Sequence, residues 1–143
     1  SSEIAQLIEY EVFIDDSFVY RQRADGILIT TSTGSTAYSL SGNGPIIHPR
    51  VNAFILMPMF AHSLNTRPLI VKDDSSIKIK IVKKGNAGIS FDSHNTLSLK
   101  AHDEVCISKT TEKLTLLHPR DHDYFDTYRT KLGWSLDVSQ IRT

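Results

Sequence analysis

Strict alternation of apolar and polar residues constrains this chain more than any other feature of its sequence. Residues 76–84, SIKIKIVKK, set isoleucines against lysines, so that every isoleucine points to one face of an extended chain. Residues 8–14, IEYEVFI, alternate in the same way with one imperfection. Polar turn residues, DDS, ADG and GNAG among them, separate further extended segments: FVYRQR, ILIT, ISFDS, TLSLK, EVCIS and KLTLLH. So many short strands predict sheet-on-sheet packing.

Two segments depart from simple alternation. Residues 53–60, AFILMPMF, are apolar throughout and predict a buried strand that reaches an edge or bend at Pro58. Helix is predicted only after the TGSTAYSLS loop and in a tail from about residue 123 to residue 133. The predicted fold is therefore mainly β: a β-sandwich of many short strands, with one short helix after that loop and a C-terminal helical tail.

Composition bounds the function. The chain has 143 residues, which suits one domain, and 16 basic residues balance 16 acidic ones. A neutral chain lacks the basic excess of nucleic-acid binders, so no nucleic-acid partner is expected. No apolar run approaches the roughly 20 residues of a membrane span, and no signal peptide is visible. Cys106 is the only cysteine. It fits a reducing compartment, and its strand position predicts a buried, inert thiol.

Residues 30–45, TTSTGSTAYSLSGNGP, hold an unusual density of hydroxyl groups directly after an apolar strand. Ser35 suits a helix N-cap and Gly42 a helix C-terminus, which gives a strand–loop–helix order. A helix N-terminus surrounded by hydroxyls suits a phosphate or a ribose. The run is not a Walker A loop, because it contains no lysine. The alternative is that these serines and threonines only satisfy turn and cap hydrogen bonds.

The segment ADGILITTSTGSTAYSLSGNGPIIHP strongly resembles the C-terminal domain signature of NAD kinases. ILMPMFAHSLNTRPLIV and HPRDHDYFDTYRTKLGW resemble bacterial members, so the resemblance covers essentially the whole chain. Two residues depart from the family pattern: Ser32 replaces the usual proline, and Asn43 replaces a common glycine. Neither departure touches the core of the motif.

The resemblance implies a phosphotransferase that uses ATP, or polyphosphate, to phosphorylate the 2′-hydroxyl of the adenosine ribose of NAD, giving NADP. It implies Mg²⁺ or another divalent cation in the full-length enzyme, a homodimer or homotetramer, and a cytoplasmic location. It places Asp25 at NAD from a neighbouring subunit, and Gln6 as a weaker match. The NAD-binding residues that it implies are Gln6, Arg23, Asp25, Thr36, Ala37, Tyr38, Ser39, Leu40, Ser41 and His94.

The family's G-G-D-G loop, with its proposed general base, and its Asn-Glu pair do not occur in these 143 residues, and the sequence does not begin with methionine. We therefore expect residues 1–143 to be the C-terminal NAD-binding and oligomerisation domain, without the N-terminal catalytic α/β domain and inactive alone. No catalytic residue, metal site or bound cofactor is expected within the chain. The alternatives are a stand-alone β-sandwich binding module and a lipid-kinase C-terminal domain of the same fold.

Overall fold

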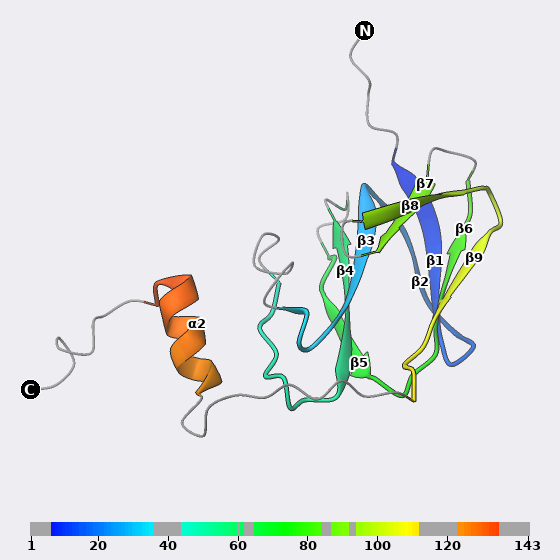
Figure 1. Ribbon diagram of the computed structural model, residues 1–143. Helices are drawn as coiled ribbons and strands as arrows, with labels where there is room; N and C mark the ends of the chain where they lie inside the picture. The colour runs from blue at the N-terminus through cyan, green and yellow to red at the C-terminus, as the bar shows by residue number, and fades with distance from the viewer. Residues whose placement is uncertain are drawn as a thin grey trace, which may run out of the picture. The chain divides into compact units, whose positions relative to one another are not determined.

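The structure is a computed structural model, and it describes residues 7–35, 44–59, 61, 65–83, 87–91, 94–111 and 123–134. Within these ranges, residues 94–96 and 131 are described by their backbone alone. The chain divides into two compact units, Ser1–Thr110 and Thr111–Thr143. The first unit holds all the described strands, and the second holds the described helix (Figure 1).

The strands form three antiparallel sheets, as the alternation predicts. The four-stranded sheet has the order β2-β1-β6-β9, from β1 (Ile8–Ile14), β2 (Ser17–Ala24), β6 (Ile77–Ile81) and β9 (Glu104–Ile107). The three-stranded sheet has the order β3-β4-β5, from β3 (Gly26–Thr31), β4 (Ala53–Met59) and β5 (Leu69–Lys72). A two-stranded sheet joins β7 (Ala87–Phe91) to β8 (His94–Leu99). The mainly β class is therefore confirmed.

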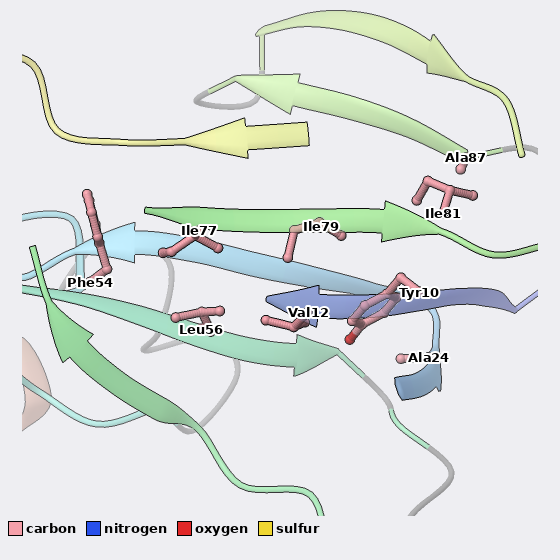
Figure 2. Packing of buried hydrophobic residues seen from close by; sticks show 9 residues of the cluster. All are labelled: Tyr10, Val12, Ala24, Phe54, Leu56, Ile77, Ile79, Ile81 and Ala87. Atoms are coloured by element: carbon pink, nitrogen blue, oxygen red, sulfur yellow. The ribbon is translucent and has the colours of Figure 1, made fainter. Parts of the chain in front are cut away.

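The two larger sheets meet through one apolar core, which confirms the sandwich (Figure 2). Its buried isoleucines are the three of the SIKIKI segment, on β6, and they belong to the same cluster as Leu56 from the opposite sheet. The hairpin of β7 and β8 adds Ala87 to the same core. The buried members of the cluster are Tyr10, Val12, Ala24, Phe54, Leu56, Ile77, Ile79, Ile81 and Ala87.

Strand β4 is apolar at every position because both of its faces are covered. Phe54 and Leu56 face the sandwich core. The alternate residues face a second cluster on the other side of the strand, which consists of Ile55 and Met57 with Ile47 and the partly buried Leu28. A strand buried on both faces shows no alternation in sequence, which explains the uninterrupted run AFILM.

Pro58 lies where β4 becomes an edge, as predicted. Pairing with β5 ends at Leu56, while pairing with β3 continues to Met59. The Met59 carbonyl accepts from the Asp25 N–H (3.0 Å), so the backbone groups of Met59 face β3. Because successive residues of a strand face opposite neighbours, the missing N–H of Pro58 falls on the unpaired side and costs no ladder hydrogen bond.

The turn between β1 and β2 is tied to a distant segment. Asp15 and Asp16 both have positive φ, 49° and 65°, as in the type I′ turns that close two-residue hairpins. The sequence predicts a turn at DDS, and the structure adds a link from Asp15 to the start of β6. Asp15 Oδ1 accepts from the Ser76 N–H (2.8 Å), and the Asp15 N–H donates to the Ser76 carbonyl (2.9 Å). This exchange fixes the hairpin tip against the start of β6.

The outer face of the four-stranded sheet carries a row of alternating charge. Register places Arg21 of β2 opposite Glu11 of β1, Glu11 opposite Lys80 of β6, and Lys80 opposite Glu104 of β9. Opposite charges on directly paired residues favour this register. Cys106 pairs with Lys78 near this row and is exposed, so the prediction of a buried thiol is wrong.

The helix α2 (Tyr124–Leu132) confirms the predicted C-terminal helical tail. Asp123 caps its N-terminus, where its Oδ1 accepts from the Phe125 N–H (2.9 Å). Gly133 ends it in the left-handed region at φ 59°, which glycine adopts without strain. The short helix predicted after the TGSTAYSLS loop and the strand predicted at KLTLLH lie outside the described residues.

Tyr20 gives the sandwich a measurable response to high pH. Burial raises the pKa of Tyr20 to about 12 from 10.0, so above pH 10 the unfolded chain loses this proton first. The contribution of Tyr20 to the free energy of unfolding is therefore fully present below about pH 10 and is lost as the pH rises toward 12. We expect Tyr20→Phe to reduce this fall by about 1–2 kcal/mol. Burial also raises the pKa of Tyr10, so part of the fall remains.

At neutral pH, Tyr20→Phe should cost little, because the Tyr20 hydroxyl is buried and has no hydrogen-bond partner in the described part of the chain. Urea unfolding between pH 8 and pH 12 measures both effects, with Tyr124→Phe on α2 as the control. Identical pH curves for the parent and Tyr20→Phe would show that this hydroxyl is not buried in solution.

Candidate functional site

The first half of the hydroxyl-rich run is held by its own hydrogen bonds. Thr31 Oγ1 accepts from the Gly34 N–H (3.2 Å). Ser35 Oγ donates to the Ser32 carbonyl (2.7 Å), and the Ser35 N–H reaches the same oxygen (3.3 Å). These bonds close the loop directly after β3. A cap from Ser35 to residue 37 or 38 would lie outside the described residues.

The same loop is anchored to the segment that precedes β4. Ser35 Oγ also accepts from the Ile47 N–H (3.4 Å), and Ser32 Oγ donates to the Pro49 carbonyl (3.5 Å). Ser35 is fully buried and Ser32 is 7% exposed. The hydroxyls of Thr31, Ser32 and Ser35 therefore form turn and loop hydrogen bonds of the kind that the alternative interpretation predicts.

Gly34 packs closely against the end of β3. A Cβ atom at this position would collide with Thr30 Oγ1. The glycine of the TSTG sequence thus lets β3 and the following loop approach each other. The predicted NAD-binding residues Thr36, Ala37, Tyr38, Ser39, Leu40 and Ser41 come immediately afterwards and lie outside the described residues.

Arg23 and Asp25 lie together where the chain leaves one sheet and enters the other. Arg23 is the penultimate residue of β2, and Asp25 stands alone between β2 and β3. Both residues are exposed, and the Asp25 N–H donates to the Met59 carbonyl (3.0 Å). This corner therefore presents one cation and one carboxylate, two residues apart, on a fixed backbone.

The structure leaves the other predicted site residues partly or wholly undescribed. His94 opens β8 and pairs with Phe91 beside a register shift in the β7–β8 hairpin, but its side chain is not among those described. Gln6 lies outside the described residues. Of the predicted set, then, the structure brings together Arg23 and Asp25 and does not test the rest.

A pocket of about 300 Å³ lies beside β2, close to this corner. Neither Arg23 nor Asp25 lines it. Its lining comes from β2, the end of β4 and the segment leading into β5: Val19, Tyr20, Gln22, Pro58, Asn65, Thr66, Arg67, Pro68 and Leu69. Gln22 on its wall donates to the Arg23 carbonyl (3.2 Å).

Among the described residues, no helix has the length and apolar character of a membrane span.

Glu9 is a residue of this corner that sequence reasoning missed. Its Oε2 lies 3.9 Å from Arg23 Nε and 3.7 Å from Lys83 Nζ, and its side chain is 13% exposed. The alternation of IEYEVFI places Glu9 on the polar face of β1, but not opposite a particular residue. The strand pairing supplies that information, because Glu9 is the direct partner of Arg23.

Comparison with known proteins identifies the family. Residues 1–118 match the ATP-NAD kinase C-terminal domain. The NAD kinase of Chromohalobacter salexigens is 50% identical over 133 residues, covering 92% of this chain and 45% of the relative. The NAD kinase of Shewanella halifaxensis is 51% identical over 134 residues, covering 92% and 43%. The chain thus spans less than half the length of the curated relatives that it matches.

Solved structures agree. Yeast NADH kinase, crystallised with NADH, matches with a TM-score of 0.82 and 30% identity over 96% of this chain and 43% of that one. An NAD kinase from Archaeoglobus fulgidus in complex with ATP matches with a TM-score of 0.68 and 28% identity, over 78% and 43%. The chain belongs to the ATP-NAD kinase C-terminal domain family.

Proposed function

We propose that this chain is the NAD-binding and oligomerisation part of an NAD kinase. The observation that carries the proposal is about 50% identity to NAD kinases over nine-tenths of the chain. The reaction transfers the γ-phosphoryl group of ATP, or a phosphoryl group of polyphosphate, to the 2′-hydroxyl of the adenosine ribose of NAD. With ATP, a new O–P bond forms, the β–γ bridging bond breaks, the hydroxyl proton leaves, and NADP and ADP result.

The ligands of two relatives support the choice of substrates. The yeast NADH kinase structure contains NADH, and the archaeal NAD kinase structure contains ATP. In this chain we assign NAD to the corner of Arg23 and Asp25 and to residues 36–41. A guanidinium suits the dinucleotide's phosphates. An ionised Asp25 only accepts hydrogen bonds, which suits an amide or a ribose hydroxyl.

The proposed reaction requires a divalent cation, which we do not assign to the described residues of this chain. Within the described ranges, no three His, Cys, Asp or Glu side chains gather to hold a metal ion. No step of the reaction is assigned to a metal held by these residues. In the proposed enzyme, Mg²⁺ belongs with the ATP phosphates.

The function is tested by measuring NADP formation from NAD, ATP and Mg²⁺. The complete protein should form NADP. The 143-residue chain alone should not, because it contains neither the G-G-D-G loop nor the Asn-Glu pair of the family. A complete protein that binds NAD but forms no NADP would favour the alternative, a β-sandwich binding module. Turnover by the chain alone would show that the site assignment is wrong.

Asp25 gives a sharper test of the NAD site. Asp25→Asn in the complete protein should raise the KM for NAD about tenfold, because a charge-assisted hydrogen bond is lost. The KM for ATP should stay within about twofold of the parent's, since the proposal places ATP outside this corner. Asp16→Asn is the matched control, an exposed aspartate in the β1–β2 turn. Equal rises in both KM values would argue for a general structural role of Asp25.

We also propose that the protein is a cytoplasmic homodimer or homotetramer in which Asp25 reaches NAD bound to a neighbouring subunit. Exposed apolar side chains on β2, β4 and β5 support self-association: Phe18 is 57% exposed, Met59 43% and Ile70 48%. Sedimentation of the complete protein at micromolar concentration should show dimers or tetramers. A monomer at every concentration would contradict the shared site.

A further inference from the structure

We propose that Glu9 is a positioning residue for NAD: its carboxylate holds Arg23 and Lys83 in place at the edge of the NAD site. The inference rests on the proposed function for the role of Arg23. It rests on the structure for Glu9 itself, which no sequence motif singles out.

Glu9 joins the two strands that flank it. On one side it pairs directly with Arg23 of β2, and its Oε2 lies 3.9 Å from Arg23 Nε. On the other side its carbonyl accepts from the Val82 N–H (2.9 Å), and Oε2 lies 3.7 Å from Lys83 Nζ. Backbone and side chain of one residue therefore fix both the end of β2 and the end of β6.

Glu9 is much more deeply buried than the two cations that it contacts. The Glu9 side chain is 13% exposed, whereas Arg23 is 58% exposed and Lys83 is 64% exposed. Among the described residues, Glu9 Oε2 is buried without a hydrogen-bond partner. A carboxylate withdrawn from water needs nearby positive charge, and here two cations supply it. In the cluster of Glu9, Arg23 and Lys83, the buried carboxylate is thus the fixed member, and the two cations are exposed to solvent.

The positions of the two cations give the cluster its role. Two residues after Arg23 comes the Asp25 corner, and Lys83 precedes the connection to the β7–β8 hairpin, where β8 begins at His94. The Glu9 carboxylate is therefore paired with cations at the ends of both β2 and β6. The next predicted NAD-binding residue along the chain is Asp25 after β2 and His94 after β6. Holding a long arginine in one orientation before NAD arrives reduces the entropy lost on binding.

Glu9→Gln removes the buried charge and leaves Arg23 and Lys83, which are both largely exposed, in contact with water. The substitution should therefore have a small effect on stability and a larger effect on binding. Glu11 provides a matched control. It lies two residues along the same face of β1, and its Oε2 is also 3.9 Å from an arginine Nε, that of Arg21. The two glutamates differ in what their arginines adjoin: only Arg23 stands next to the Asp25 corner.

The experiment compares Glu9→Gln with Glu11→Gln in the complete protein. Glu9→Gln should raise both the KM for NAD and the calorimetric Kd for NAD about three- to tenfold. The KM for ATP should not change, and the melting temperature should stay within about 2 °C of the parent's. Glu11→Gln should change none of these values. Equal effects of the two substitutions on NAD would overturn the inference, since they would indicate a general charge effect.

A double-mutant cycle with Arg23→Gln tests the mechanism. If Glu9 acts through Arg23, adding Glu9→Gln to Arg23→Gln should cause little further rise in the KM for NAD. A full additional rise would show that Glu9 does not act through Arg23. If Glu9→Gln fails to fold, Glu9→Asp keeps the charge and should raise the KM by a smaller factor; no rise would count against the proposal. A parent protein that forms no NADP would refute the proposed function, whereas an active parent with an unchanged Glu9→Gln would refute only this inference.

Discussion

One extra residue in β2 decides which side of the four-stranded sheet the rest of that strand faces. Near the turn, Ile14 pairs with Ser17 and Phe13 with Phe18, but the next pair is Val12 with Tyr20. Val19 has no partner and forms a β-bulge. Without this shift, the residues that follow would face the opposite side, and Arg21 and Arg23 would point into the apolar core.

The bulge links the core to the candidate site. With it, Tyr20 and Ala24 join the sandwich core, while Arg21 and Arg23 face outward opposite the two glutamates of β1. The chain then crosses to the second sheet at Asp25, whose N–H is bound by the end of β4. The exposure of Arg23 and Asp25 and the burial of Tyr20 are thus consequences of a single register.

The sequence predicts the strands better than it predicts their partners. Alternation locates β1 and β6, and the proline of AFILMPMF marks the edge of β4, because both signals are local. The bulge at Val19 is not predictable from alternation, since simple counting back from the turn would place Glu9 opposite Gln22. The pairing of Glu9 with Arg23 therefore follows from the structure and not from the sequence pattern. The exposure of Cys106 agrees with the local pattern, because Glu104 lies two residues before it on the same face of β9.

The hydroxyl run shows why local chemistry alone could not locate the site. A loop that leaves helical N–H groups free for a ligand must satisfy its other polar groups within itself. Thr31, Ser32 and Ser35 do so here, two of them buried, and Gly34 allows the close approach. Binding hydroxyls and structural hydroxyls look identical in sequence, because both are serine or threonine beside a glycine. Burial and hydrogen bonding distinguish them: the hydroxyls of Ser32 and Ser35 are buried and support the loop backbone, whereas binding of NAD by the residues that follow Ser35 stays a prediction.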